Sequence, residues 1–391
     1  MKSIGILATH PIQYYSPIFR CLAKEKSIDL MVYYCLRPTQ KEQGTGFGVP
    51  FEWDTDLLSG YPSVWLNNIS KSPGLDRSTG LDTPEIGDLI KKRKVDAFLI
   101  TDWRYKSMWQ AIRVCRQTST PLLVRGDSHL RTKGMLFKKV VKEMTHRYLI
   151  KQFSACLAVG SWSREYFTHY GARNIFFSPH CVDNEYFSSQ ADKVKNEKRI
   201  LKKGWDIPED SFVFLFVGKF EPKKRPMDLL QAAKIMIREK SLNKLFHILM
   251  VGDGPLKKEC QRFSNVESLP ASFAGFLNQS QMPKAYAVSD VLVLPSDFRE
   301  TWGLVVNEAM ACGLPAIVSD EAGCGPDLIR EGKTGFIYPC GDTRSLSVKM
   351  FEMAHDKTAI RMGENARARI AGYSVDKAVQ GILQAVGAVT G

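Results

Sequence analysis

The chain has 391 residues, of which 44% are hydrophobic, and a formal net charge of +13, which favours a globular protein with two domains over one with a single core. The longest apolar runs, such as 212–218, have the length of a strand, which excludes a helix of the roughly 20 apolar residues needed to cross a bilayer. The nine cysteines form no C-x-x-C pair, and polar residues follow the first short apolar run, so we expect a reduced cytoplasmic protein without structural zinc, disulfides or a secretory signal.

Apolar runs of strand length recur along the whole chain and are separated by segments of helix length. In the first half they predict strands at 3–8, 29–35, 97–101, 121–126, 155–160 and 174–179. In the second half they predict strands at 213–218, 247–252, 271–276, 291–296, 315–320 and 334–339. Buried strands of this kind, alternating with helices, form parallel sheets covered on both faces. The sequence therefore predicts an α/β protein with two doubly wound, Rossmann-like domains, whose ligands bind at the carboxyl ends of the strands, in a cleft between the domains.

The two sets of strands also predict the domain boundaries. The N-terminal domain covers 1–187 and the second domain covers 212–372. The charged stretch 188–211 between them is typical of a linker region. The last segment, 373–391, predicts a helix that is opened by Ser374.

The largest stretch without a clear pattern is 36–90, in which Phe47, Phe51 and Trp53 lie among glycine, proline and aspartate. It is longer than most loops in compact domains. Two interpretations stay open. The aromatic faces either bind a ligand that contains a sugar ring or pack beneath a long loop.

Positive charge is concentrated in the first half, where residues 1–185 carry +9 and the remainder carries +4. Within that half, 131–153 holds seven basic residues and one acid, Glu143, with apolar residues at spacings of three and four. This pattern predicts an amphipathic basic helix, which suits an anionic membrane surface. The alternative is an ordinary surface helix with solvated lysines. No nucleic-acid-binding module is recognised, so nucleic acid is not an expected partner.

Two lysines follow the first predicted strand of the second domain. Lys219 comes directly after it, and Lys224 lies five residues further on. Ammonium groups at the carboxyl end of a strand, opposite a helix N-terminus, form a plausible clamp for a diphosphate. Taken alone, the segment favours solvated lysines in a turn.

Two glutamates, eight positions apart, flank a later loop and helix. Glu300 lies in the loop after the strand at 291–296, and Glu308 lies about two turns inside the predicted helix. The start of that helix, around Gly303 and Leu304, offers N–H groups and a positive dipole to an anion. A carboxylate beside a phosphate would repel it, so we expect the glutamates to bind sugar and ribose hydroxyls.

Taken in order, "VGKFEPKKRPMDLLQA", "VGDGPL", "FAGF", "AYAVSDVLVLPS", "ETWGLVVNEAMACGLPAIVSDEAGCGPDLI" and "KTGFIYPCGD" resemble the C-terminal domain of glycosyltransferase family 4. These are retaining enzymes of GT-B fold. The likeness covers nearly all of 212–342, and its E-x7-E element is the most specific part. "FFSPHCVDNEYF" (176–187) also resembles the interdomain segment of the family, with His180 and Cys181 in place of Asn and Gly.

The resemblance implies a role for each matching residue of the second domain. Lys219 and Lys224 would hold the diphosphate of a nucleotide-sugar donor, and Glu300 would contact the hydroxyls of the donor sugar. Glu308 would bind the ribose. The backbone N–H groups near Trp302, Gly303 and Leu304 would bind the distal phosphate, and Gly275 and Phe276 would border the nucleobase. Trp302 replaces the more usual Phe, a difference expected to alter the shape of the sugar pocket.

The first domain departs further from the family. The loop after its first strand contains His10 in place of a glycine-rich sequence. It either approaches the donor or serves as a helix start anchored by tyrosines. The cleft histidine of the family follows the fourth strand, where this chain has Asp127 and His129. Either of them takes that role, or neither does. The resemblance also implies that the C-terminal helix crosses back to the first domain.

The chemistry implied by the resemblance needs no cofactor and no metal. The leaving diphosphate gains negative charge, which the two lysines and the helix N-terminus would stabilise. The chain does contain one D-x-D pattern, Asp54 to Asp56, which binds a metal in many glycosyltransferases of the other major fold. Because this pattern lies in the N-terminal excursion, away from the predicted donor strands, we expect no metal site there.

Three functional hypotheses follow. The first is a retaining glycosyltransferase at the cytoplasmic membrane face that transfers sugar to a glycan or lipid-linked acceptor in cell-surface polysaccharide biosynthesis. The second is a nucleotide-sugar epimerase of GT-B architecture, which the complete E-x7-E element argues against. The third is a basic binding protein without catalytic activity, which the intact donor residues argue against.

Overall fold

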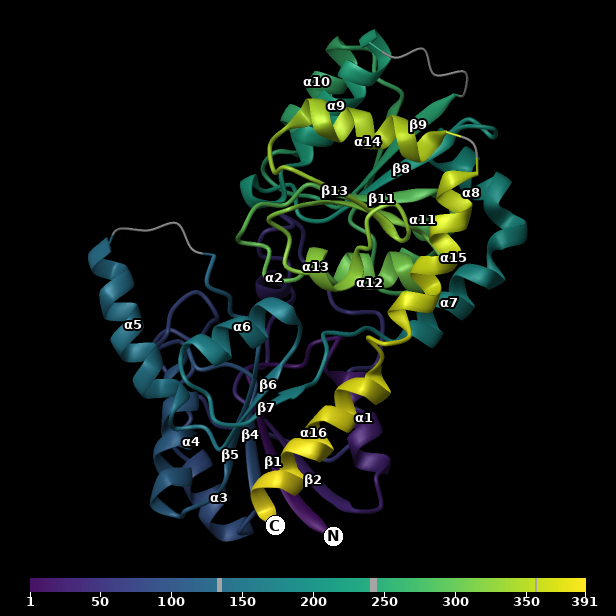
Figure 1. Ribbon diagram of the computed structural model, residues 1–391. Helices are drawn as coiled ribbons and strands as arrows, with labels where there is room; N and C mark the ends of the chain where they lie inside the picture. The colour runs from purple at the N-terminus through teal and green to yellow at the C-terminus, as the bar shows by residue number, and fades with distance from the viewer. Residues whose placement is uncertain (132–135, 240–244, 356) are drawn as a thin grey trace. The chain divides into compact units, whose positions relative to one another are not determined.

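The computed structural model describes residues 1–131, 136–239, 245–355 and 357–391, and the side chains of 136–139 are not described (Figure 1). The chain forms two compact units. The first contains Met1–Glu42, Asp56–His180 and Val375–Gly391, and the second contains Gln43–Thr55 and Cys181–Ser374. Each unit is built on one parallel sheet. Within the described ranges, no helix combines the length and the apolar composition that a membrane span requires.

The sheet of the first unit has seven parallel strands in the order β3-β2-β1-β4-β5-β6-β7. Its central strands are buried along almost their whole length, as expected of a sheet covered on both faces. The strands are β1 (Lys2–Ala8), β2 (Ile28–Tyr34), β3 (Ser63–Trp65), β4 (Ala97–Ile100), β5 (Leu122–Gly126), β6 (Ala155–Ala158) and β7 (Ile175–Phe177).

The helices of the first unit pack against this sheet and against each other. Helix α16 contacts β4, β6 and β7 and lies beside α1, while α3 lies beside α4. Because α16 is the last helix of the chain, the first unit contains both the N-terminus and the C-terminus (Figure 1). The helices are α1 (Ser16–Lys24), α3 (Ile86–Arg93), α4 (Lys106–Gln117), α5 (Leu136–Ile150), α6 (Ser161–His169) and α16 (Val375–Thr390).

The second unit has a six-stranded parallel sheet in the order β10-β9-β8-β11-β12-β13. Its first strand, with the sequence FVFLFV, is buried at every position, which is typical of the centre of such a sheet. The strands are β8 (Phe212–Val217), β9 (Phe246–Val251), β10 (Ala271–Gly275), β11 (Val291–Leu294), β12 (Ala316–Ser319) and β13 (Gly335–Tyr338).

In the second unit, two helices and a 3-10 turn precede the first strand, β8. The stretch 188–211, expected to be a linker region, is mostly helical, and its helix α8 packs against α11. The helices and 3-10 turns are α7 (Asn184–Lys193), η1 (Lys195–Glu197), α8 (Lys198–Gly204), η2 (Pro222–Lys224), α9 (Pro226–Glu239), α10 (Lys257–Val266), α11 (Met282–Val288), α12 (Leu304–Ala311), α13 (Gly325–Leu328), α14 (Thr343–Ala354) and α15 (Thr358–Ile370). The short α2 (Gln40–Gln43) leads into the segment Gln43–Thr55.

The predicted fold class is confirmed. Both sheets are doubly wound. In each of them the order in which strands are added reverses beside the first strand, between β1 and β4 in one sheet and between β8 and β11 in the other. All twelve predicted strands are present within a few residues of their expected bounds, and one further strand, β3, lies in the stretch without a clear pattern. In open sheets of this kind ligands bind at the carboxyl end of the reversal point.

The packing of α16 gives the first prediction. A Cβ at Gly381 would lie 1.9 Å from the Phe177 carbonyl oxygen, whereas one at Gly387, on the same helix, would meet no atom within 4 Å. Gly381→Ala should therefore lower the free energy of unfolding by about 1–3 kcal/mol. Gly387→Ala should raise it by up to about 1 kcal/mol, because alanine is the better helix former. Urea denaturation of both variants measures the difference, and equal shifts would contradict the contact between α16 and β7.

Candidate active site

Two loops of the second unit meet where its sheet reverses. One follows β8 and contains Lys219 and Lys224. The other follows β11 and contains Glu300. The backbone N–H of Asp297 donates to the Lys223 carbonyl oxygen at 2.8 Å and ties the loops together. They meet because β8 and β11 are neighbours in the sheet although they are distant in sequence.

Lys224 and Glu300 form an ion pair across these loops. Their side chains are only 14% and 12% exposed. Lys224 lies at the end of the turn η2, and its side chain extends over Gly218. A Cβ added to Gly218 would lie 3.6 Å from Lys224 Cδ. An amine and a carboxylate so poorly exposed interact more strongly than a surface pair. The pair places one positive and one negative group side by side at the carboxyl edge of the sheet.

The loop after β11 leads directly into α12. Gly303 has φ +102°, and a Cβ there would lie 2.6 Å from Leu294 Cδ2, so glycine is required. Gly323, in the loop after β12, donates its backbone N–H to the Glu300 carbonyl oxygen at 3.0 Å. The N–H groups at the start of a helix have no acceptor one turn earlier in it; in α12 the Val306 N–H donates to the Gly303 carbonyl oxygen at 2.9 Å, and Leu304 and Val305 come before it. These N–H groups give this edge a positive partial charge next to Glu300.

The side chain of Trp302 points into the second unit. It is buried, its Nε1–H donates to Asn307 Oδ1 at 2.8 Å, and its ring lies 6.0 Å from that of Tyr373. The indole therefore supports α12 from within the unit, and only the backbone of Trp302 belongs to the loop.

Glu308 lies deeper than Glu300. It is 3% exposed, and the Tyr286 hydroxyl donates to its Oε2 at 2.6 Å. The expected depth of two turns is wrong, since α12 begins at Leu304 and Glu308 follows after about one turn. A buried carboxylate needs such donors, because desolvation without a hydrogen bond is costly.

Lys219 lies beside a segment that the sequence did not associate with it. Its Nζ donates to the Thr45 carbonyl oxygen at 2.7 Å and lies 4.9 Å from the centre of the Phe47 ring. Burial lowers the pKa of the Lys219 ammonium below its ordinary value. Phe276, next to Gly275 at the end of β10, packs against Phe51 with ring centres 4.4 Å apart. The only signal in the sequence for the contacts of Thr45, Phe47 and Phe51 with the second unit was the presence of aromatic residues in an unusually long loop.

The D-x-D pattern is divided between the two units. The Asp54 carboxylate accepts a hydrogen bond from the Ser280 backbone N–H at 3.1 Å. The Asp56 carboxylate accepts from the backbone N–H groups of Leu58 at 2.9 Å and Ser59 at 3.1 Å. Both aspartates thus fix loop backbone.

In the first unit, Asp127 lines a cavity of about 530 Å³ at the carboxyl ends of β4 and β5. Asp127 Oδ2 lies 3.7 Å from His180 Nε2, and burial lowers the pKa of His180. His129 is outside the cavity lining. It is buried beside Trp162, and its Nδ1 accepts a hydrogen bond from the Arg131 backbone at 3.1 Å.

The same cavity contains residues that sequence reasoning missed. Trp103 and Arg104 line it together with Asp102, whose pKa is raised by burial. The signal was available, because Asp102 directly follows the predicted strand at 97–101.

His10 follows β1, its Nδ1 lies 3.0 Å from Thr9 Oγ1, and burial lowers its pKa to about 4.

Comparison with known proteins finds relatives of this chain. Residues 197–369 match the family described as "Glycosyl transferases group 1". The chain is 30% identical over 278 residues to the sulfoquinovosyl transferase SQD2 of Arabidopsis thaliana, covering 66% of this chain and 50% of that protein. It is 31% identical over 206 residues to the Escherichia coli UDP-Gal:alpha-D-GlcNAc-diphosphoundecaprenol alpha-1,3-galactosyltransferase, covering 52% of this chain and 51% of that protein. The chain thus spans about half the length of these relatives.

The fold has been seen in solved structures. A glycosyltransferase from Rickettsia africae superposes with a TM-score of 0.75 at 16% identity, over 99% of this chain and 98% of that one. The two doubly wound sheets therefore define the GT-B class of fold. Residues 197–369, all within the second unit, carry the glycosyl transferases group 1 domain.

Proposed function

We propose that this protein is a retaining, metal-independent glycosyltransferase. It would move a sugar from a nucleoside-diphosphate sugar to a glycan or lipid-linked acceptor in cell-surface polysaccharide biosynthesis. The observation that carries the proposal is the meeting of Lys224, Glu300 and the start of α12 where β8 and β11 diverge. The names of the relatives support it, since one uses UDP-Gal and a diphosphoundecaprenol-linked acceptor.

The donor diphosphate would bind Lys219, Lys224 and the first N–H groups of α12. Lys224 then shares its ammonium between the phosphate and Glu300, which offsets the repulsion between the carboxylate and the anion. Glu300 keeps an acceptor oxygen for a hydroxyl of the donor sugar. Glu308, held in place by the Tyr286 hydroxyl, would bind the ribose as a hydrogen-bond acceptor.

The same groups would assist departure of the nucleoside diphosphate. As the bond from the sugar to the leaving oxygen breaks, negative charge grows on the diphosphate, and fixed positive groups stabilise that charge where it develops. Retention fits a front-face reaction in which the leaving phosphate accepts the proton of the acceptor hydroxyl. In this reaction no side chain is needed as a nucleophile.

The acceptor would bind the cavity of the first unit. Two carboxylates, Asp102 and Asp127, an arginine, Arg104, and the indole of Trp103 line it. Carboxylates and a guanidinium suit sugar hydroxyls as hydrogen-bond partners, and an indole suits the apolar face of a sugar ring. We assign Asp127 to this site in preference to His129, because only Asp127 lines the cavity.

An anionic membrane surface is proposed as a partner of α4 and α5. The predicted basic helix is present as α5, although residues 132–135 of the predicted range lie outside the described residues. Several of its described apolar side chains face solvent, with Met144 70% exposed, whereas Leu149 and Ile150 are buried, and Trp109 of α4 is 42% exposed. Exposed apolar side chains among basic ones are typical of a helix at a membrane surface.

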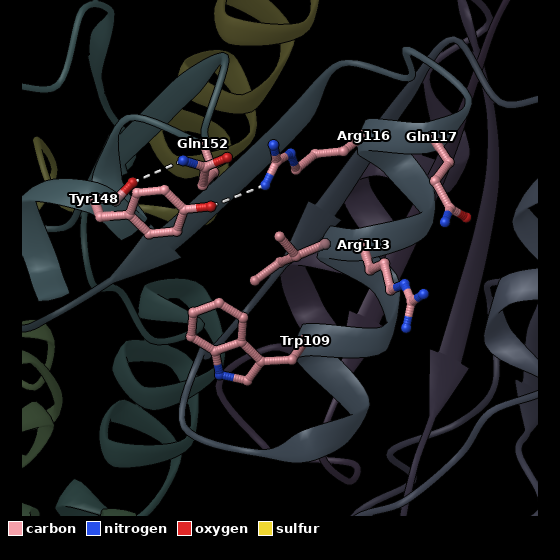
Figure 2. Close-up of a pocket in the computed structure, with 7 residues that line it drawn as sticks. Trp109, Arg113, Arg116, Gln117, Tyr148 and Gln152 are labelled. Atoms are coloured by element: carbon pink, nitrogen blue, oxygen red, sulfur yellow. Dashed lines mark hydrogen bonds between the residues drawn. The ribbon is translucent and has the colours of Figure 1, made fainter.

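Between these helices lies a groove of about 340 Å³ (Figure 2). Arg113 and Arg116 line it with Trp109 and Tyr148, and Arg116 donates to the Tyr148 hydroxyl at 3.1 Å. Aromatic and guanidinium groups together suit the headgroup region of an anionic bilayer. Attachment by this face would place the enzyme at the cytoplasmic surface of the membrane.

The first prediction from this proposal concerns Lys224. Lys224→Ala should weaken nucleoside diphosphate binding roughly 10–100-fold, because it removes a charged donor and leaves Glu300 to repel the anion. Lys223→Ala is the matched control, since Lys223 pairs with Glu221 at 3.4 Å and its side chain is 36% exposed. Calorimetric titration of both variants tests the role, and equal affinities would exclude Lys224 from the site.

The second concerns metals. Transfer should persist in excess EDTA, because Lys219, Lys224 and the start of α12 supply the positive charge that a divalent ion would otherwise provide. Product formation from a radiolabelled nucleotide sugar is the measurement. Abolition by EDTA followed by rescue with Mn²⁺ or Mg²⁺ would overturn the metal-independent reaction.

The third concerns the membrane. Arg113→Gln with Arg116→Gln should weaken binding to phosphatidylglycerol vesicles, measured by sedimentation, about 30-fold, since each basic residue near an anionic surface contributes about 1 kcal/mol. The control is Lys24→Gln with Lys26→Gln, an equal loss of exposed charge at the end of α1. Helices α1 and α4 cover opposite faces of the sheet because right-handed crossovers leave β1 and β4 in opposite directions. Equal losses in the two double variants would remove α4 from the proposed surface.

A further inference from the structure

A segment from the first half of the chain belongs to the second unit. Residues Gln43–Thr55, which we call the strap, lie in sequence between β2 and β3 of the first sheet. They nevertheless pack with Cys181–Ser374. The strap thus adds N-terminal residues to the unit that contains Lys219, Lys224 and Glu300.

The strap contacts the loops at the carboxyl ends of three neighbouring strands. After β8 it meets Lys219, through the Thr45 carbonyl. After β9 it approaches Gly254, where an added Cβ would lie 3.1 Å from the Gly46 carbonyl oxygen. After β10 its aromatic side chains pack on Phe276. The strap therefore runs along the edge of the sheet at which ligands bind in this class of fold.

The far end of the strap is fixed by polar contacts. Asn278 Nδ2 donates to the Glu52 carbonyl oxygen at 2.6 Å, and the Ser280 backbone N–H donates to Asp54 at 3.1 Å. The middle is fixed by rings, since Phe51 packs at 4.4 Å on Phe276 and at 4.9 Å on Trp53. These contacts make the strap a built part of the unit.

The near end of the strap surrounds the amine of Lys219. The Thr45 carbonyl accepts from Nζ at 2.7 Å, and the Phe47 ring centre lies 4.9 Å from the same atom. Between these residues Gly46 has φ +85°, and an added Cβ would lie 2.9 Å from both Nζ and Cδ of Lys219. The backbone at residue 46 therefore approaches the lysine more closely than any other residue type would allow.

We propose that the strap positions Lys219 for the donor diphosphate, with Thr45 and Phe47 as positioning residues. The inference rests on the proposed function, in which Lys219 binds that diphosphate. A free lysine side chain loses up to about 2 kcal/mol of rotamer freedom when it is immobilised, and fixing it beforehand removes part of this cost from binding. One N–H of Nζ donates to Thr45, and an ammonium has two more for phosphate oxygens.

Two glycines of the strap allow a matched test. Gly46 and Gly48 both have positive φ, +85° and +73°, so alanine strains the backbone at either position. A Cβ at Gly48, however, meets no atom within 4 Å. Gly46→Ala displaces Lys219 and Gly48→Ala does not. The difference between the two variants isolates the contact with the lysine.

The experiment is calorimetric titration of the full chain with UDP, GDP and ADP. Gly46→Ala should bind the tightest of these nucleotides about 3–10-fold more weakly than Gly48→Ala. In a Lys219→Ala background this difference should disappear, which a purely structural role of Gly46 would not produce. Equal affinities of the two glycine variants, or tighter binding by Gly46→Ala, would overturn the proposal.

Phe47 provides a second route that does not depend on backbone strain. Phe47→Leu removes the ring beneath the ammonium and should weaken binding about 2–5-fold, whereas Phe47→Tyr keeps the ring and should bind like the parent protein. If Leu and Tyr bind alike, the ring has no positioning role. Normal binding by Lys219→Ala alone would instead refute the proposed function of the lysine. The two failures are therefore distinguishable.

Discussion

The candidate site depends on one feature of the second sheet, the adjacency of β8 and β11. The chain leaves β8 towards β9 and β10 on one side and returns beside β8 to continue towards β12 and β13 on the other. The connections after the two central strands therefore lead away in opposite directions. Their first residues meet at the carboxyl edge of the sheet. Lys224 and Glu300, 76 residues apart, become an ion pair for this reason.

Positive and negative groups lie close together where the loops after β8 and β11 meet. Lys224 neutralises Glu300, the start of α12 contributes partial positive charge, and Lys219 lies against a carbonyl and an aromatic ring. Removing water from any one of these groups alone would be costly. Their mutual contacts offset that cost, so the groups stay fixed at the edge of the sheet. Fixed polar groups are what stabilisation of a charged leaving group requires.

Much of this arrangement could be predicted from the sequence. Runs such as FVFLFV specify buried parallel strands, and residues that directly follow them, Lys219 and Asp127 among them, fall at the carboxyl edge of a sheet. The roles of side chains set further from a strand were less predictable. Trp302 turns inward to Asn307, and His129 packs on Trp162 outside the neighbouring cavity, because each side chain follows local packing that no spacing encodes.

The sequence by itself determined the two sheets, their strands and the family of the second unit, since these follow from hydrophobic periodicity and from motifs contiguous in the chain. Only the tertiary structure decided that residues 43–55 join the second unit, that the stretch 188–211 is mostly helical and part of that unit, and that Asp102 shares a cavity with Asp127. These are contacts between segments separated by tens to hundreds of residues. Their free energy arises from surfaces that exist only once the sheets have formed, so no local pattern in the sequence records them.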